Sequence, residues 1–198
     1  MSFLTLLDCF GALCGFVATG LSSQNDIRHW PISIMSFVLY GIIFASIGMY
    51  GNSLVQFLLL AMSFVGWKNW SSDTSVIRWA STYELMIALC MGLLGGGIIV
   101  LLQVVFSHLN WEDALSAAFL FISIYALGQR YIQVWMLFFC LDVYFCIVML
   151  QSGLYFSAAK YLSYLFFAQQ GYFKWYSQVE QDRSFNNKHL SSMQPSCN

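Results

Sequence analysis

Long apolar runs, separated by short polar breaks, recur along almost the whole chain. Each run has about 18–25 residues, enough at about 1.5 Å per residue to cross a hydrocarbon core of about 30 Å. In lipid such runs must form helices, because no water is present to bond unpaired backbone groups. The pattern predicts an all-α membrane protein with seven transmembrane helices, over residues 3–21, 30–49, 52–70, 83–107, 111–128, 133–152 and 156–176.

Composition supports a lipid environment and narrows the chemistry. The chain is 59% hydrophobic and only 9% charged, whereas soluble domains carry about 25% charged residues. The first run contains Asp8 and follows no Lys or Arg, which favours a helix over a cleaved signal peptide. The six cysteines form no C-x-x-C motif, and the three histidines are scattered. We therefore expect no metal, no cofactor and no nucleic-acid partner.

Basic residues are distributed unevenly between the two sides of the predicted membrane protein. One side receives seven of them: Arg28, Lys68, Arg78, Arg130, Lys174, Arg183 and Lys188. The other side receives none, and Lys160 lies inside the seventh run. Basic loops stay in the cytoplasm, so the N-terminus is expected outside and the C-terminus inside. We expect a multi-pass protein of a bacterial inner (plasma) membrane.

The chain also aligns with itself after a shift of 105 residues. Five landmarks, Trp30, Gly48, Tyr50, Gly66 and Trp70, then fall on Trp135, Gly153, Tyr155, Gly171 and Trp175. Each copy holds three spans, and an odd number of spans ends on the opposite side of the membrane. One extra crossing must therefore separate the copies if both start on the same side. The alignment predicts a three-plus-one-plus-three parallel repeat about an axis along the membrane normal.

This repeat divides the chain into four parts. The first three-helix copy covers 1–70, and the second covers 110–176. Between them, 71–109 comprises a polar cytoplasmic connection and the linking helix. The last part, 177–198, is rich in Ser, Gln and Asn with few apolar residues, so we expect a disordered cytoplasmic tail.

Asp142 is the most informative single residue inside a predicted span. It follows the start of the sixth helix by nine residues, which places it roughly 13 Å deep. A carboxylate at that depth costs on the order of 2.5–3.5 kcal/mol, which is tolerated where it faces a polar cavity or a cation. A structural hydrogen bond to a neighbouring helix is the alternative. Lys160 would lie about 10 Å away along the membrane normal, so we expect it to extend toward the outer surface.

Other side chains add aromatic and polar contacts around this carboxylate. Trp135 precedes Asp142 by two helical turns on about the same face, where its ring could cradle a flat cation. Gln56, Tyr164 and Gln170 offer directed hydrogen bonds without net charge, which suit a sugar-like or heteroaromatic ligand. Hydrogen bonds between helices are the alternative for each of them. The other tryptophans at cytoplasmic helix ends are expected in an interfacial aromatic belt: Trp30, Trp70 and Trp175.

Two stretches of the chain resemble the PnuC-type vitamin transporters, whose best-known members carry nicotinamide riboside. Residues 40–70 read YGIIFASIGMYGNSLVQFLLLAMSFVGWKNW and resemble the family's second and third helices. Residues 129–175 resemble its last two helices, and the overall resemblance covers about 5–175. It implies a SWEET-like helix arrangement in the lipid bilayer. It also implies facilitated diffusion driven by a cytoplasmic kinase that phosphorylates the product, and a homo-oligomer such as a trimer.

The resemblance also suggests roles for individual residues. In the family, a W-x-x-W pair on the sixth helix stacks on the substrate and a polar residue follows. Here Trp135 and Phe138 occupy the pair, and Asp142 the polar position. We hypothesise that the two rings stack on the ligand and that Asp142 offsets its charge. Gln56, Tyr164 and Gln170 would bond the ribose or carboxamide.

Phe138 stands where the family has its second tryptophan, so the resemblance does not decide which vitamin is carried. Nicotinamide riboside and thiamine are both permanent cations with a flat ring, as Asp142 and Trp135 require. Riboflavin is neutral and larger, so it suits the site less well.

Two other classes of function remain as alternatives to a transporter: a membrane-embedded enzyme and a non-transporting membrane scaffold. The sequence holds no H-E-x-x-H, no G-x-S-x-G and no phosphate-binding glycine loop, so we expect no catalytic residues.

Overall fold

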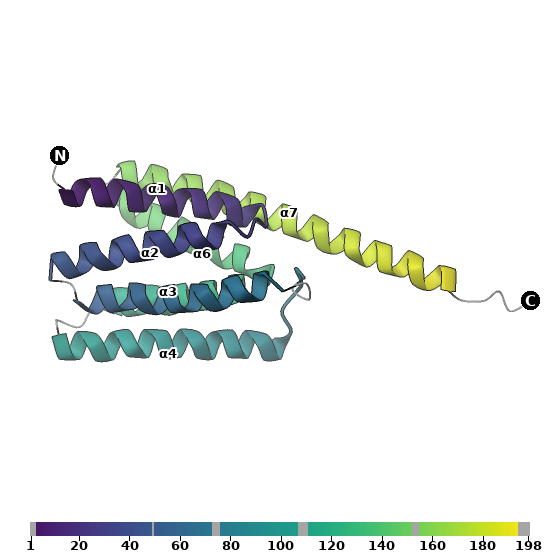
Figure 1. The fold of residues 1–198 in the computed structure, drawn as a ribbon, viewed down its shortest axis with the longest axis horizontal. Coiled ribbons are helices and arrows are strands. Elements are labelled where there is room, and N and C mark those ends of the chain that lie inside the picture. Colours follow the sequence, from purple (N-terminus) through teal and green to yellow (C-terminus); the bar gives the residue numbers. More distant parts are fainter. Residues whose placement is uncertain (1–2, 49, 73–75, 107–110, 152–154, 194–198) are drawn as a thin grey trace, which may run out of the picture.

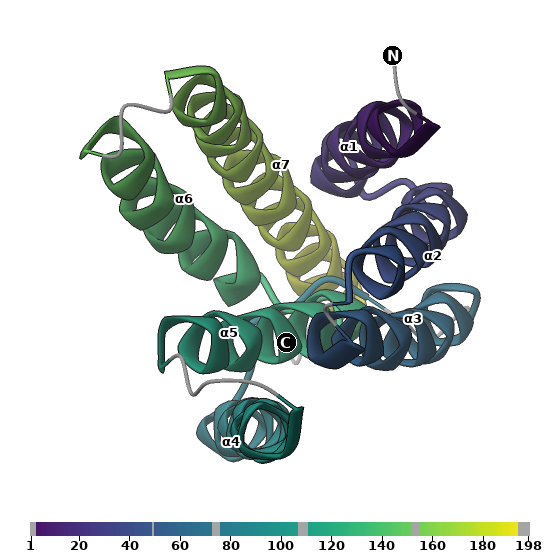
Figure 2. The same cartoon turned by 90° about the vertical axis from the view of Figure 1, so that its left-hand side faces the viewer.

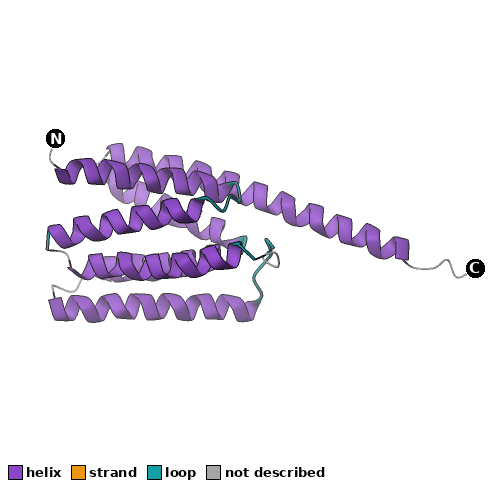
Figure 3. Ribbon diagram, viewed as in Figure 1, coloured by secondary structure: helices purple, strands orange, loops and turns teal. Residues whose placement is uncertain are grey.

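All seven predicted runs form helices in the computed structural model, which describes residues 3–48, 50–72, 76–106, 111–151 and 155–193. Within these residues the helices are joined by short loops and turns, and the remaining regular structure is one isolated β-bridge (Figure 3). The helices are α1 Phe3–Ser23, α2 His29–Ser46, α3 Tyr50–Trp70, α4 Thr82–Phe106, α5 Trp111–Gly128, α6 Gln133–Gln151 and α7 Tyr155–Met193 (Figure 1). The predicted all-α fold is confirmed.

Several helices have the length and apolarity needed to cross a membrane. Within the described residues, three stretches meet both conditions: Leu6–Ser23, His29–Ser46 and Thr82–Val105. Ala117–Gly128 and Gln133–Ile147 are shorter apolar stretches. Large apolar side chains also face outward, as Leu93, Leu94 and Val104 do on α4. An outer surface of this kind suits lipid better than water.

Helix contacts follow the two halves of the chain. α1 packs on α2 and α2 on α3, while α6 packs on α7 and α4 lies against α5 (Figure 2). The halves meet through two contacts, α3 with α5 and α1 with α7. In the alignment shifted by 105 residues, α1 corresponds to α5 and α3 corresponds to α7. The α3–α5 contact and the α1–α7 contact therefore join equivalent pairs of helices. The interface between the halves is therefore built twice from equivalent helices.

The turns that follow α1 and α5 share one backbone conformation. Asn25 and Arg130, which are 105 residues apart, both have positive φ angles, of 57° and 56°. The N–H of Asn25 donates to the carbonyl of Ser22 at 3.0 Å, and that of Arg130 donates to the carbonyl of Leu127 at 3.0 Å. Such matching agrees with a duplicated unit. The parallel three-plus-one-plus-three arrangement stays a prediction.

Four tryptophans form the centre of the core at the end of the bundle where these turns lie. Trp30, Trp70, Trp135 and Trp175 are 0%, 3%, 1% and 0% exposed. Trp30 meets Trp70 edge to face with centroids 5.7 Å apart, and Trp135 meets Trp175 in the same way at 5.3 Å. Trp70 and Trp175 join the two pairs at 5.9 Å. The expected aromatic belt is therefore wrong for Trp30, Trp70 and Trp175, which pack inside the bundle.

Two glycines make room for these indoles. A Cβ atom at Gly66 would overlap the Trp30 ring, and one at Gly171 would overlap the Trp135 ring. Gly66 and Gly171 are again 105 residues apart. In each half, the tryptophan of the second helix thus packs directly on the backbone of the third helix, at a glycine.

The connection before α4 is bound to the turn before α6. The Arg78 N–H donates to the carbonyl of Arg130 at 3.2 Å, and the Ile132 N–H donates to the carbonyl of Arg78 at 3.1 Å. The Gln133 amide accepts a hydrogen bond from the Ala80 N–H at 3.0 Å and donates to the Ala80 carbonyl at 3.1 Å. The linking helix is therefore anchored to the second half by four hydrogen bonds.

The tail is the main correction to the predicted domain organisation. α7 continues to Met193 and projects beyond the other helices (Figure 1), where we expected disorder from residue 177. No Gly or Pro interrupts residues 172–193, so the helix propagates beyond the apolar run. Val179 packs on the tryptophan core, and the Asn25 amide donates to Gln178 at 3.4 Å. Residues 194–198 lie outside the described part of the chain.

Candidate functional site

A cavity of about 390 Å³ lies between the two halves of the chain. The first half contributes α1 and α2, and the second contributes α5, α6 and α7. Its polar lining residues are Thr19, Ser22, His29, Ser33, Ser36, Asp142, Tyr161 and Tyr164. Its volume lies within the range of about 300–1,000 Å³ that is typical of small-molecule sites.

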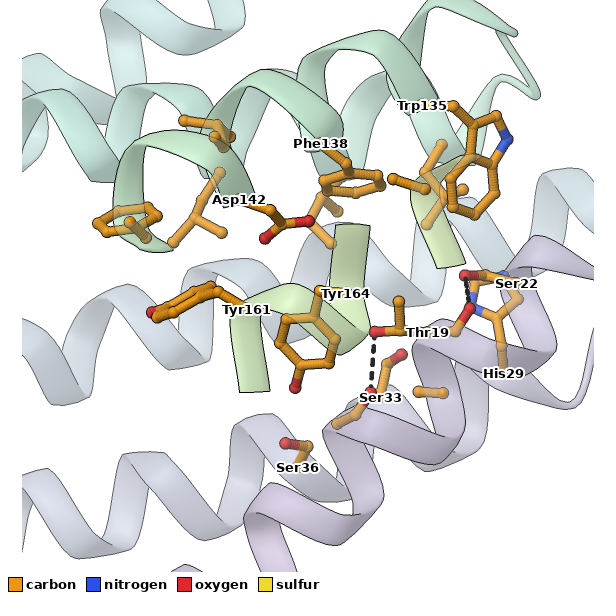
Figure 4. Close-up of a pocket in the computed structure, with 18 of the residues that line it drawn as sticks. Thr19, Ser22, His29, Ser33, Ser36, Trp135, Phe138, Asp142, Tyr161 and Tyr164 are labelled. Carbon is orange, nitrogen blue, oxygen red and sulfur yellow. Dashed lines mark hydrogen bonds between the residues drawn. The ribbon is translucent and has the colours of Figure 1, made fainter. Parts of the chain in front are cut away.

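The α6 wall of the cavity combines two aromatic rings with a carboxylate. Trp135, Phe138 and Asp142 are spaced three and four residues apart, so they share one face of the helix (Figure 4). The rings of Trp135 and Phe138 meet edge to face with centroids 5.8 Å apart. Trp135 is held by Trp175 behind it, while Phe138 is only partly buried. Phe138 therefore has the more accessible ring of the pair.

The α7 wall places two phenols opposite the carboxylate. Tyr161 and Tyr164 meet edge to face with centroids 6.2 Å apart, and Tyr161 stacks on Phe145 of α6 at 5.3 Å. Asp142 points toward this pair across the cavity (Figure 4). The Tyr164 hydroxyl reaches α1 near Gly15, where a Cβ atom would lie 3.9 Å from it. Tyr164 thus extends from one half of the chain to the other.

The wall made by α1 and α2 carries hydroxyl groups. The Thr19 hydroxyl donates to the Gly15 carbonyl at 2.9 Å, and that of Ser22 donates to the Thr19 carbonyl at 2.9 Å. The Ser36 hydroxyl donates to the Gly11 carbonyl at 2.9 Å. In each case the hydrogen is used inside the protein, so the oxygen lone pairs are left to accept a bond from a ligand.

Charged groups cluster near the tryptophan end of the bundle, outside the cavity lining. The Arg28 guanidinium and backbone N–H both bond Asp26, which lowers the pKa of that carboxyl to about 2. The Arg130 guanidinium lies 4.5 Å from the ring centroid of Trp70, and burial lowers its pKa. Arg28 is exposed at this end of the bundle, whereas Arg130 is partly buried against Trp70.

Comparisons with known proteins agree with a membrane transporter. The family model described as nicotinamide mononucleotide transporter matches residues 5–177. The chain belongs to this family. The nicotinamide riboside transporter PnuC of Escherichia coli (strain K12) is 22% identical over 205 residues, which cover 87% of this chain and 85% of the relative. The protein of the same name from Shigella flexneri matches with the same identity and coverage.

A solved structure extends the likeness to the fold. The crystal structure of the vitamin B3 transporter PnuC superposes with a TM-score of 0.69. At 16% sequence identity, the match covers 89% of this chain and 83% of the other. The transporter family and the apolar helices together identify a multi-pass membrane protein. A family of transporters also confirms the expectation that the chain is not an enzyme.

Four of the six predicted site residues meet in the cavity of this family member. Trp135, Phe138, Asp142 and Tyr164 all line it. Gln170 is exposed instead, because it lies six residues after Tyr164 and so faces another side of α7. It lines a separate, shallow hollow on that helix. Gln56 is half-buried on α3 against α2, close to the position of Gly41, and is not among the lining residues.

Lys160 makes no ion pair with the Asp142 carboxylate among the described residues. Its side chain is exposed, with the Nζ atom 4.7 Å from the ring centroid of Tyr161.

Sequence reasoning missed the wall contributed by the first half. His29, Ser33 and Ser36 are spaced four and three residues apart, so they form a polar stripe on one face of α2. That stripe on an otherwise apolar helix was the available signal. The predicted residue of the first half, Gln56, lies on α3 and is not among the lining residues.

Proposed function

We propose that this chain carries nicotinamide riboside across a bacterial inner membrane by facilitated diffusion, with the cavity as its binding site. The observation that supports this best is the position of Asp142 beside Trp135 and Phe138 in the cavity. A flat cationic ring would stack on the aromatic side chains and be balanced by the carboxylate. The names of the relatives support the same substrate.

The charge of the lining favours the riboside over the mononucleotide. Among the described lining residues, Asp142 is acidic and there is no Lys or Arg. A phosphate would bring two negative charges close to Asp142 without a cation to balance them. Like charges in a poorly solvated site repel by several kcal/mol. The unphosphorylated ligand is therefore the better partner for this cavity.

Thiamine is the alternative, because it is also a flat permanent cation. The hydroxyl-bearing wall of α1 and α2 favours the riboside, since ribose has several hydroxyls and thiamine has one. Riboflavin lacks the positive charge that Asp142 would balance. Tyr164 is proposed to bond the polar part of the ligand from the opposite wall.

We also propose a membrane orientation, a partner kinase and an oligomeric state for the transporter. We place the N-terminus outside and the C-terminus in the cytoplasm, on the basis of the basic residues counted above. A cytoplasmic kinase would trap the product by phosphorylation, which keeps the inward gradient of the riboside. A homo-oligomer such as a trimer in the lipid bilayer follows from the family resemblance.

Purified protein titrated by calorimetry tests the substrate, and counterflow of labelled riboside in liposomes tests transport. We expect nicotinamide riboside to bind more tightly than nicotinamide mononucleotide or thiamine. Asp142→Asn should weaken the riboside by about tenfold or more, because a desolvated cation loses its counter-charge. Neutral nicotinamide should be affected far less.

Asp8→Asn is the matched control, because Asp8 is an exposed carboxylate of α1 that does not line the cavity. It should leave both ligands unaffected. Equal losses of riboside and nicotinamide binding in Asp142→Asn would contradict the charge argument. Tight binding of thiamine without binding of the riboside would contradict the proposed substrate.

A further inference from the structure

The wall made by α1 and α2 contains a histidine that the contacts proposed so far do not use. His29 begins α2, is 1% exposed and lines the cavity. Its imidazole packs against the rings of Trp30 and Trp70, with centroids 4.3 Å and 4.5 Å away. The imidazole thus packs against two indole rings at this end of the cavity.

The Nε2 atom of His29 is buried and has no hydrogen-bond partner among the described residues, as is also the case for the indole nitrogens of Trp30, Trp135 and Trp175, of which Trp135 lines the same cavity. Leaving such an atom unpaired costs about 1–3 kcal/mol. Buried polar atoms in native proteins are almost always paired, and an exception calls for an explanation. This atom has almost no accessible surface, so a ligand in the cavity that His29 lines would supply the missing partner once the imidazole turns toward it.

Hydroxyl groups line the same cavity as this imidazole. Ser22, His29 and Thr19 all line the cavity and are drawn at the same end of it in Figure 4. The hydroxyl hydrogens of Ser22 and Thr19 are already bonded to backbone carbonyls. Their oxygens can therefore accept hydrogen bonds from a ligand. A ligand hydroxyl suits this end well, because it can donate and accept at once.

The position of this polar end defines which part of a ligand would reach it. Trp135 lies on the wall opposite His29, while Asp142 lies further along the cavity (Figure 4). Seven residues separate Trp135 from Asp142, which corresponds to about 10 Å along α6. A ligand whose cationic ring stacks on Phe138, between Asp142 and Trp135, would thus extend its other end past Trp135 toward His29.

We infer that His29, Ser22 and Thr19 form a hydroxyl-binding subsite that takes the ribose of a ribosyl-pyridinium ligand. This rests on the proposed function. The first half of the chain would then recognise the sugar and the second half the charged ring. The duplicated position of His29 is Val134, which is buried and does not line the cavity. The subsite therefore belongs to one copy of the repeat.

Two ligands that differ in the sugar test this division. Nicotinamide riboside has the ribose, and 1-methylnicotinamide keeps the same cationic ring without it. His29→Phe keeps a flat ring but removes both nitrogens, so it should weaken the riboside by about tenfold. The affinity of 1-methylnicotinamide should stay unchanged. His29→Gln, which restores a polar group, should recover part of the riboside affinity.

Ser22→Ala gives a second and milder perturbation, with Ser63→Ala as its matched control. Both hydroxyls are buried and donate to a backbone carbonyl, but only Ser22 lines the cavity. Ser22→Ala should weaken the riboside several-fold, and Ser63→Ala should leave binding unchanged. If His29→Phe does not elute as a folded protein, the serine pair decides the question.

The outcomes separate this inference from the function on which it rests. Unchanged riboside affinity in both His29→Phe and Ser22→Ala would overturn the subsite and leave the proposed function intact. Equal losses for the riboside and 1-methylnicotinamide would also overturn it, because the histidine would then act on the ring or on the fold. A wild-type protein that does not bind the riboside would overturn the proposed function and the subsite together.

Discussion

Gly171→Ala is a sharp test of how the tryptophan core supports the site. The added Cβ atom would lie 2.6 Å from Cδ2 and Cε2 of Trp135, well inside van der Waals contact. The indole cannot move away freely, because Trp175 and Phe138 pack against it. Overpacking of this kind costs about 1–3 kcal/mol, while Ala gains about 1 kcal/mol over Gly in a helix. We expect a net loss of up to about 2 kcal/mol.

For a chain of this size such a loss lowers the melting temperature in detergent by up to about 8 °C. Because Trp135 and Phe138 are in contact, riboside affinity should fall as well. Gly97→Ala is the matched control, since nothing lies within 4 Å of a Cβ atom at Gly97 on α4. It should keep or slightly raise the melting temperature. A variant Gly171→Ala with unchanged melting temperature and affinity would refute the proposed packing.

Two further changes probe groups outside the cavity. Lys160→Gln should change riboside affinity by less than about threefold, because exposed charges contribute little; a larger change in calorimetry would indicate coupling to Asp142. Gln133→Ala removes two hydrogen bonds to Ala80 and should lower the melting temperature by a few degrees. Gln151→Ala, at an exposed position on the same helix, should not, and equal effects of the two would contradict the anchoring role.

The pattern of apolar runs was enough to predict the seven helices and the class of protein. Each run had to form a helix in lipid, whatever its neighbours, because the backbone must bond to itself there. The end of α7 could not be predicted in this way. Residues 177–193 are polar, and their first turns are supported by contacts of Gln178 and Val179 with the rest of the bundle.

The packing of the tryptophans inside the bundle could not be predicted from the sequence either. Their positions at helix ends were correct, but an interfacial belt and a buried cluster require the same positions in sequence. Gly66 and Gly171 decided between them, since only a bare helix backbone lets Trp30 and Trp135 pack so closely. That pairing joins residues that lie 36 apart in each half, so it becomes visible only after the helices are assembled.

Only part of the site could be predicted, because helical spacing relates residues of one helix but not residues of different helices. Trp135, Phe138 and Asp142 could be grouped from sequence because helical spacing alone puts them on one face of α6. Which other helices face them depends on tertiary packing. The structure brings α1 and α2 there with His29 and the hydroxyls, and leaves Gln56 and Gln170 outside the lining. The sequence by itself thus determined the helices and one wall of the cavity, because both follow from local periodicity. The opposite wall was decided by how the two halves pack together.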